Sequence, residues 1–271
     1  MARATEPNAI LLHRIEAAPG LGIFRVAPDG WPLPEFTPGQ FAVLGLPARS
    51  PRVALSDPEE PGNPDRMIQR AYSIASSSRA REYVEVFANL VRSGELTPRL
   101  FALEPGERLW LGPKFTGMFT LREVPPGRHL AMIATGTGLA PYMSMLRTEL
   151  DCADPRRVAV LHGARHSWDL GYAGELYTMQ RECRAFTYLP TISRPQAEPT
   201  PWGGATGHVQ ELWTGGALAR AWGFRPTPAD THVLLCGNPA MIEDMTARLA
   251  AEGFRLHEPR SPGQVHVERY W

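Results

Sequence analysis

The sequence has 271 residues, of which 43% are hydrophobic and 21% are charged, a composition typical of a globular protein with a sizeable core. Lysine plus arginine and aspartate plus glutamate number 28 each, so no net charge attracts nucleic acid or an anionic membrane. The arginines are scattered rather than clustered, and Lys114 is the only lysine. These numbers exclude a disordered chain and argue against a nucleic-acid-binding domain.

We expect neither a targeting segment nor a membrane span. The first residues contain an apolar run of only four residues, broken by His13, and the most apolar stretch, 129–146, contains glycines and a proline. Cys152, Cys183 and Cys236 are odd in number and widely spaced, so we expect no disulfide framework and no metal site. The sequence thus predicts a cytoplasmic protein.

The first half of the chain predicts a small antiparallel β-barrel. Short segments rich in β-branched and aromatic residues alternate with glycine and proline turns. The expected strands are 22–27, 40–46, 72–76, 83–91, 108–112 and 117–121. One helix is expected between a cap at Thr97 and Pro105.

The second half alternates strands with helices, which predicts a parallel sheet with crossover helices. The expected strands are 129–135, 157–164, 185–193, 232–237 and 265–271, and the expected helices are 140–150, 173–183 and 239–253. Segment 208–213 belongs to the same rhythm, after a proline-rich loop over 194–207. The fold class is therefore a β-barrel domain over 1–123 followed by an α/β domain over 124–271.

The turn Gly136-Thr137-Gly138 joins the first strand of the α/β half to a helix. Glycines let the backbone approach a phosphate, and a helix start offers N–H groups to an anion. Without other observations, such a turn is equally well a tight connection. Ligands of open α/β sheets lie beyond the carboxyl ends of the strands, which favours binding here.

Two other strand ends carry suggestive residues. Ser193 and Arg194 offer a hydroxyl and a guanidinium without an acid, as sites for the 2′-phosphate of NADP do. The alternative for Arg194 is an ordinary solvated charge. Cys236 ends a later strand, and its alternative is a small buried side chain.

Two segments with aromatic residues also allow either a structural or a ligand-binding interpretation. Arg70, Tyr72 and Ser73 place a guanidinium, a flat ring and a hydroxyl within four residues, with Ser73 on the opposite face of the strand. The chain ends on Tyr270 and Trp271, which either pack as a strand end or cover a flat ligand.

The ordered motifs "RAYS", "GELTPRL", "GPKFTGMFTL", "ATGTGLAPY", "SRP", "LLCGNPAM" and "VERYW" span nearly the whole chain. Together they resemble the ferredoxin–NADP reductase family, and most closely its bacterial ferredoxin/flavodoxin subgroup that ends in Tyr-Trp. The resemblance implies an FAD-binding barrel, an NADP(H)-binding α/β domain, and a monomeric enzyme. Such an enzyme exchanges hydride with NADP(H) and single electrons with ferredoxin or flavodoxin through FAD.

The resemblance also assigns residues to each cofactor and to the reaction. Those assigned to FAD are Arg70, Ala71, Tyr72, Ser73, Phe87, Glu95, Leu96, Thr97, Tyr270 and Trp271. Those assigned to NADP(H) are Thr137, which touches both nucleotides, Ala164, Arg165, Ser193, Arg194 and His208. Those assigned to the reaction are Ser73, Cys236, Glu268 and Tyr270.

In this scheme Arg70 pairs with the FAD diphosphate, Tyr72 and Tyr270 stack on opposite flavin faces, and Ser73 lies near flavin N5. Trp271 packs on the adenine. His208 departs from relatives that carry arginine there, so the preference for NADP is expected to be weaker or pH-dependent.

Two alternatives stay open. One is an NAD(P)H-dependent flavin reductase that serves another acceptor, an oxygenase component or a quinone. The other is a flavin-binding electron-transfer subunit of a larger complex. Such proteins often carry an extra cysteine cluster, and the three scattered cysteines favour the standalone enzyme.

Overall fold

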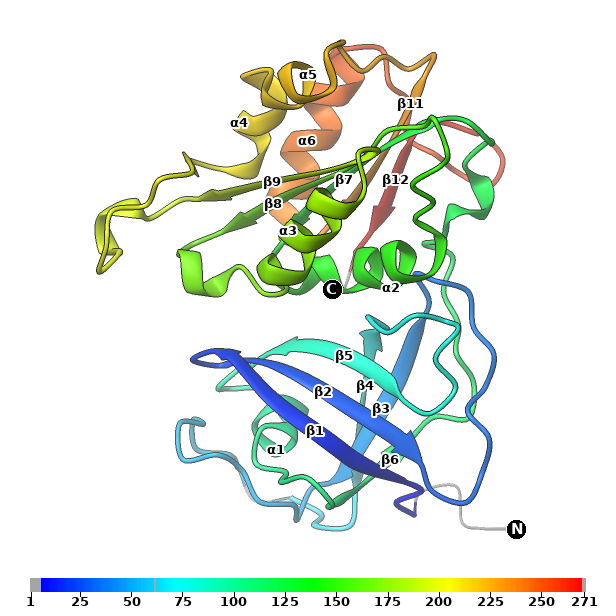
Figure 1. Ribbon diagram of the computed structural model, residues 1–271. Coiled ribbons are helices and arrows are strands. Elements are labelled where there is room, and N and C mark those ends of the chain that lie inside the picture. The colour runs from blue at the N-terminus through cyan, green and yellow to red at the C-terminus, as the bar shows by residue number, and fades with distance from the viewer. Residues whose placement is uncertain (1–5, 61, 270–271) are drawn as a thin grey trace. The chain divides into compact units, whose positions relative to one another are not determined.

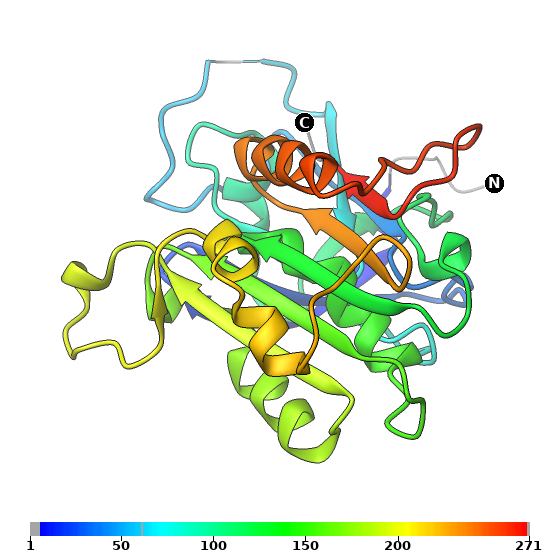
Figure 2. The same cartoon turned by 90° about the horizontal axis from the view of Figure 1, so that it is seen from above.

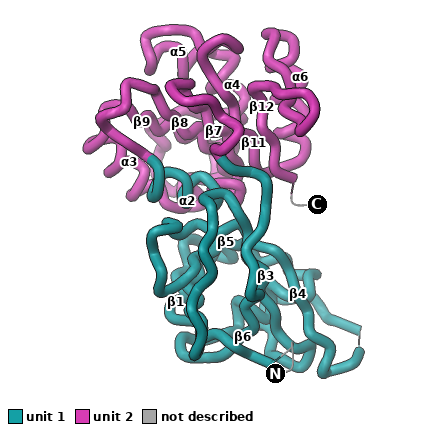
Figure 3. The backbone as a smooth tube through the Cα atoms, turned by 90° about the vertical axis from the view of Figure 1, so that its right-hand side faces the viewer, with its two compact units in different colours: residues 1–120, 140–149 teal, residues 121–139, 150–271 magenta. Residues whose placement is uncertain are grey.

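The computed structural model describes residues 6–60 and 62–269 (Figure 1). Tyr270 and Trp271, for which the sequence predicts a stacking role, lie outside the described residues. The chain divides into two compact units, Met1–Thr120 with Ala140–Glu149, and Leu121–Leu139 with Leu150–Trp271 (Figure 3). None of the helices that the structure describes is long and apolar enough to cross a membrane.

The first unit is an antiparallel sheet of six strands in the order β4-β3-β6-β1-β2-β5. An isolated bridge between Ile74, which follows β4, and Val86 of β5 links the two edge strands, so the sheet curls into a barrel. Its core contains the fully buried Phe24 and Leu44. The strands are β1 (Ala9–Ala18), β2 (Leu21–Pro28), β3 (Phe41–Pro47), β4 (Met67–Ser73), β5 (Val84–Asn89) and β6 (Arg108–Leu111).

The sequence analysis missed β1 and misplaced two other strands. The register of β1 against β2 shifts twice, between Leu11 and His13 and between Glu16 and Ala18. Each irregularity interrupts the alternation of polar and apolar residues that identifies a strand. Strand β4 begins at residue 67, not at 72. The expected strand over 117–121 is instead irregular and leads into the 3₁₀ turn η1 (Leu121–Glu123).

The helix of the first half is shorter than expected, and its cap is different. It is α1 (Leu96–Leu100), with Glu95 at the N-cap position. The expected cap, Thr97, uses its hydroxyl to accept a hydrogen bond from the N–H of Val91 at 3.0 Å. Thr97 therefore ties α1 to the preceding turn instead of capping it.

The second unit is a six-stranded sheet, entirely parallel, in the order β10-β9-β8-β7-β11-β12. Its strands are β7 (His129–Thr135), β8 (Val158–Ala164), β9 (Phe186–Ile192), β10 (Ala205–Thr206), β11 (Thr231–Cys236) and β12 (Val265–Glu268). The fold class predicted from the sequence, an antiparallel barrel followed by a parallel α/β sheet, is confirmed.

Helices cover the parallel sheet (Figures 1 and 2). Leu161 and Val233 face a core built with α4, α5 and α6, whereas Tyr188 faces α3, where its ring meets Tyr177. Because both faces are covered, the strands read as continuous apolar runs. The helices are α3 (Ala173–Glu182), α4 (Val209–Thr214), α5 (Ala217–Trp222) and α6 (Pro239–Ala251); α5 was not expected, and η4 (Pro195–Ala197) and β10 interrupt the loop predicted over 194–207.

Helix α2 (Ala140–Glu149) follows β7 in sequence through the 3₁₀ turn η2 (Gly136–Leu139), but it groups with the barrel unit. Arg147 donates to the carbonyl oxygen of Ala75 at 2.8 Å, and the hydroxyls of Ser77 and Thr148 lie 3.0 Å apart. These contacts fasten the end of α2 to the segment that follows β4.

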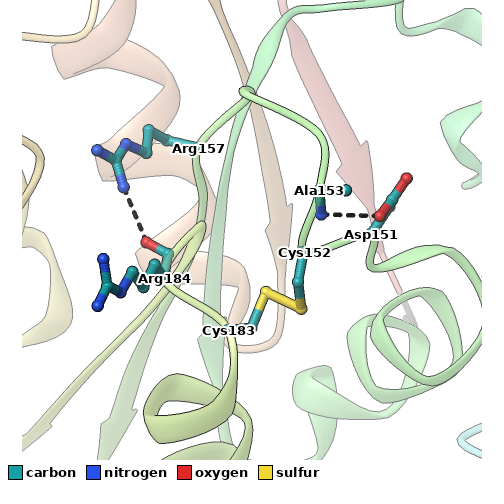
Figure 4. The surroundings of a disulfide bond; sticks show 6 residues. All are labelled: Asp151, Cys152, Ala153, Arg157, Cys183 and Arg184. Atoms are coloured by element: carbon teal, nitrogen blue, oxygen red, sulfur yellow. Dashed lines mark hydrogen bonds between the residues drawn. A yellow bond between two sulfur atoms is a disulfide. The ribbon is translucent and has the colours of Figure 1, made fainter.

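The second unit contains a disulfide between Cys152 and Cys183 (Figure 4). We expected no disulfide framework from the three scattered cysteines, and this single pairing was not predicted. Cys152 lies in the turn before β8, and Cys183 ends α3. Since a crossover helix runs back along its strand, α3 returns the chain to the level at which β8 begins, and the Cα atoms lie 5.1 Å apart. Sequence spacing does not reveal this approach.

Candidate cofactor and active sites

Strand β4 displays the residues expected to hold a flavin. Its register with β3 is regular, with Arg70 opposite Leu44 and Tyr72 opposite Ala42. Arg70 and Tyr72 therefore share one face, while Ser73 lies on the other face and is buried. Burial raises the pKa of the Tyr72 phenol, so this ring is neutral at every physiological pH.

The Arg70 guanidinium is held by a carboxylate. Its Nη2 donates to Oε2 of Glu95 at 2.8 Å, and Arg66, which immediately precedes β4, pairs with Oε1 of the same carboxylate. The hydrogen bond from Arg66 and that from Arg70 lower the pKa of Glu95. Two half-exposed arginines thus converge on one point of the barrel surface, where an anion can bind.

A buried arginine holds the turn before α1 in place through hydrogen bonds. Arg99 is 3% exposed and donates to the carbonyl oxygens of Glu95 at 2.7 Å and Ala48 at 3.0 Å. Its guanidinium also pairs with Glu59. Leu96 is buried in the barrel core. The backbone of residues 95–97 is therefore held in place independently of the Glu95 side chain.

Other expected flavin residues lie elsewhere on the barrel. Ala71 is exposed on β4, on the face opposite to Arg70. Phe87 is 3% exposed on β5 and does not belong to the barrel core that contains its neighbours Val86 and Ala88. It therefore lies on the outer face of β5.

A buried carboxylate of β5 and two arginines form an ion-pair group beside the segment that follows β4. Glu85 of β5 accepts from Nε of Arg25 and from Nη1 of Arg147, each at 2.7 Å. Its carboxylate is almost fully buried, whereas both arginines are partly exposed. Glu85 also donates its backbone N–H to Ser76 at 3.1 Å. This group fixes residues 75–76, which follow the Tyr72-Ser73 segment after Ile74.

In the second unit, two glycine-containing turns meet at the carboxyl end of the sheet. A Cβ on Gly138 would lie 2.3 Å from the carbonyl oxygen of Cys236, so only glycine fits there. Gly237 has a φ of 132°, and the N–H of Asn238 donates to Oγ1 of Thr135 at 2.8 Å. The turn that contains Thr137 therefore packs backbone to backbone against the turn after β11.

This meeting point is the switch point of the sheet. Strand β7 lies between β8 and β11, so strands added later in the sequence extend the sheet in both directions from it. Ligands of open α/β sheets bind in the crevice that such a reversal leaves. The glycine contacts show that the backbone there is close-packed.

Cys236 and Glu268, both expected to act in the reaction, are brought together. They are partners in the parallel register of β11 and β12, and the thiol of Cys236 donates to Oε2 of Glu268 at 3.7 Å. Cys236 is fully buried, as the alternative interpretation of a small core side chain requires. The contact with a carboxylate gives it a polar partner that a purely apolar role would not need.

The residues expected to bind the 2′-phosphate also gather at one edge. The N–H of Ser193 donates to Ala164 at 3.0 Å, and the N–H of Arg194 donates to Arg165 at 2.9 Å. These bonds place the ends of β8 and β9 side by side. Arg165 and Arg194 are exposed, so both guanidiniums can reach a ligand.

His208 approaches the same edge from β10. Gly207 donates to Ile192 at 2.9 Å and accepts from Thr191 at 3.1 Å, which holds the next residue beside the end of β9. His208 is exposed at the start of α4, and its backbone N–H donates to Oε1 of Glu211 at 3.0 Å. The histidine that replaces an expected arginine therefore stands beside a carboxylate.

Comparisons with known proteins agree with this geometry. Residues 132–247 match the family described as "Oxidoreductase NAD-binding domain". A flavodoxin/ferredoxin–NADP reductase of Shigella flexneri is 33% identical over 241 residues, which cover 89% of this chain and 90% of that protein. The chain belongs to the ferredoxin/flavodoxin–NADP reductase family. It is therefore an oxidoreductase of the FAD-dependent class to which we assigned it from the sequence.

Solved structures of this fold extend the comparison. A ferredoxin–NADP reductase from Neisseria gonorrhoeae, with bound FAD and NADP, matches with a TM-score of 0.81 and 25% identity over 99% of this chain and 100% of that one. The expected cofactor pair is the pair in that structure. A cytochrome P450 reductase from Amycolatopsis has the same fold, with a TM-score of 0.73, 24% identity, and coverage of 97% of this chain and 69% of that one.

The sequence analysis overlooked two residues of these candidate sites, Arg66 and Thr135. Arg66 joins the expected residues Arg70 and Glu95 in one cluster, and its only sequence signal is its position four residues before the "RAYS" motif. Thr135 holds the two glycine turns together, and as the last residue of an apolar strand it has no distinguishing pattern.

Proposed function

We propose that this chain exchanges hydride with NADP(H) and single electrons with ferredoxin or flavodoxin through FAD, as a monomer in the cytoplasm. The observation that carries the proposal is the similarity to the Shigella flexneri reductase, which spans both units. The convergence of the motif residues into two clusters, one in each unit, supports it.

In this proposal the barrel binds FAD. Arg70 pairs with the diphosphate, and the backbone N–H groups of Glu95, Leu96 and Thr97 lie nearby. Exposed guanidiniums that already hold a carboxylate are suited to a phosphate group, which presents a similar pair of oxygens. Ala71, Tyr72, Ser73 and Phe87 complete the assignment around the flavin ring.

The parallel sheet binds NADP(H) in the same proposal. Thr137 and the glycine turns receive the nucleotide, and Ala164 and Arg165 line it. Ser193, Arg194 and His208 contact the 2′-phosphate. The exposed guanidiniums at the ends of β8 and β9 support this assignment, whereas Glu211 beside His208 weakens the attraction for phosphate at that corner.

Nicotinamide transfers two electrons as hydride and iron–sulfur proteins accept one, and bound FAD supplies chemistry that connects the two. The residues of the chain would position the cofactors and transfer protons. The buried Cys236 thiol donates a hydrogen bond to the Glu268 carboxylate at 3.7 Å, which orients that carboxylate, and Glu268 would accept or return protons at the reaction centre. Ser73 would offer its hydroxyl beside the flavin, and Tyr270 and Trp271 would cover the ring and the adenine.

A second acceptor class stays open, because the Amycolatopsis cytochrome P450 reductase has the same fold. Under this alternative the same two cofactor sites pass electrons to an oxygenase component. A flavin-binding subunit of a larger complex would retain the flavin site but would not be reduced by added NADPH.

Spectroscopy on the purified full chain separates these functions. We expect a yellow flavoprotein whose absorbance bleaches with NADPH in the absence of oxygen and returns on adding oxidised ferredoxin or flavodoxin. Docking of an acidic partner on arginines weakens with salt, so turnover with ferredoxin should fall as ionic strength rises, and turnover with ferricyanide should change less. A purified chain without flavin would refute the proposal. A salt-independent response with every ferredoxin and flavodoxin would favour the other acceptors.

A further inference from the structure

A single carboxylate on the barrel holds two guanidinium groups. Oxygen Oε1 of Glu95 pairs with Arg66, and oxygen Oε2 pairs with Arg70 at 2.8 Å. All three side chains are between a third and about half exposed. Exposed ion pairs contribute little to stability. The arrangement therefore needs an explanation other than holding the barrel together.

The backbone around this carboxylate is held in place by buried contacts, and the carboxylate itself makes none of them. The Glu95 carbonyl is fixed by buried Arg99, which is itself held by Ala48 and Glu59. Arg70 lies within the regular register of β3 and β4. The Glu95 side chain can therefore turn away from both arginines without moving the backbone of the barrel.

A carboxylate and a phosphate group offer guanidinium the same pair of anionic oxygens. We infer that Arg66 is a second arginine of the diphosphate site, and that the Glu95 carboxylate occupies the place of a phosphate until a flavin dinucleotide displaces it. This rests on the proposal that the barrel binds FAD. The resemblance assigned only the backbone of residues 95–97 and the side chain of Arg70 to the diphosphate.

The displacement has an energetic consequence. Two arginines with one carboxylate leave a net positive charge, so the more highly charged diphosphate wins the competition. The displaced Glu95 then remains close to the phosphates as a like charge. Its carboxylate therefore weakens FAD binding, and an uncharged side chain of the same shape should tighten it.

The inference is tested by titrating FAD into full-length protein from which flavin has been removed. The dissociation constant is read from the quenching of flavin fluorescence. We expect Glu95→Gln to bind FAD about three- to tenfold more tightly than the unmodified chain, with Glu95→Ala changing in the same direction. Arg66→Ala should bind it about tenfold more weakly.

Arg49→Ala is the matched control, because Arg49 is an exposed arginine that pairs with Asp65 in the same region of the barrel. It should leave the dissociation constant unchanged. The gain in Glu95→Gln should also shrink at high salt, since it arises from charge.

If Glu95 serves instead to orient the arginines for the diphosphate, both Glu95 variants will bind FAD more weakly, and the inference is wrong. Equal dissociation constants in all variants would also overturn it, while leaving the proposed function intact. A chain that binds no FAD in any variant would overturn the proposed function as well.

Discussion

The candidate sites of the two units are formed by different kinds of chemical group. The barrel presents charged side chains, with Arg66 and Arg70 gathered on Glu95. The site of the parallel sheet is built on close-packed backbone, where a Cβ on Gly138 would meet the carbonyl of Cys236 and the ends of β8 and β9 are hydrogen-bonded. The exposed arginines Arg165 and Arg194 lie at those two strand ends. A site made of charges can be adjusted by one side chain, because the backbone stays in place. A site made of close-packed backbone tolerates almost no added atom.

The pKa values of the ionisable groups also differ between the two units. In the barrel, carboxylates such as Glu59 and Glu95 have a lowered pKa because arginines pair with them. In the second unit, burial lowers the pKa of His162 to about 4 and that of His266 to about 3. Carboxylates with a lowered pKa also occur in the second unit, at Asp230 and Asp244. The difference is that the second unit also contains histidines that must remain neutral.

The largest expected effect concerns the disulfide, which lies in the second unit only. It closes a loop with a sequence separation of 31 residues, so reduction should lower the free energy of unfolding by about 3–4 kcal/mol. Hydrogen exchange with and without reductant should show faster opening of residues 150–271 and little change in the barrel strands. The variant Cys152→Ser with Cys183→Ser should not respond to reductant. Identical exchange in both conditions would contradict the disulfide.

Gly138→Ala should damage the backbone-built site most directly. The added Cβ would meet the Cys236 carbonyl at 2.3 Å, which backbone cannot easily relieve. We expect a loss of about 3 kcal/mol in NADPH binding, or roughly a hundredfold. Gly174→Ala is the matched control, because nothing lies within 4 Å of the Cβ it would add. Similar NADPH affinity in both variants would remove the turn from the nucleotide site.

Glu85→Gln tests how far the barrel relies on buried charge. The substitution leaves Arg25 and Arg147 without their shared carboxylate and should cost about 2–3 kcal/mol in the free energy of unfolding. It should also shift the flavin absorption spectrum, since Arg147 and Glu85 hold residues 75–76. Glu35→Gln breaks an exposed pair with Arg81 and should change neither quantity. An unaltered denaturation midpoint in Glu85→Gln would show that the buried group is dispensable.

Acid should weaken the sheet unit before the barrel. An unfolded histidine takes up a proton near pH 6.5, whereas folded His162 resists until its pKa of about 4. Stability is therefore complete above pH 6.5 and falls as the pH decreases toward 4. This residue alone should cost about 2 kcal/mol between pH 7 and pH 5. His162→Gln should reduce that loss, whereas substitution of exposed His208 by glutamine should not. Equal acid sensitivity of both variants would dismiss the contrast between the units.

The sequence predicted what depends on local pattern. Strand–helix alternation predicted the second unit with boundaries within one or two residues at β7, β8 and β11, because each of these strands is a continuous apolar segment. Strand β1 was missed, because its two register shifts break the alternation. The pairing of Cys152 with Cys183 depends on where a crossover helix ends in space.

Within the candidate sites, the motifs predicted which residues are involved but not their partners. Arg70 was recognised from "RAYS", but its link through Glu95 to Arg66 joins segments 25 and 29 residues apart. The contact of Cys236 with Glu268 depends on two strands that are 32 residues apart becoming neighbours. Long-range pairings of this kind leave no local trace in the sequence.

The most direct test of the central claim is anaerobic reduction of the bound flavin by NADPH and by NADH in rapid-mixing experiments. We predict that NADPH reduces the flavin with the higher second-order rate constant, the limiting rate of reduction divided by the dissociation constant. Arg194→Ala should lower the NADPH-to-NADH ratio of this rate constant about tenfold to a hundredfold, because a guanidinium–phosphate contact is lost. Arg181→Ala, at an exposed arginine of α3, should leave the ratio unchanged. A flavin that NADPH does not reduce, or a ratio that is the same in Arg194→Ala as in the unmodified chain, would contradict it.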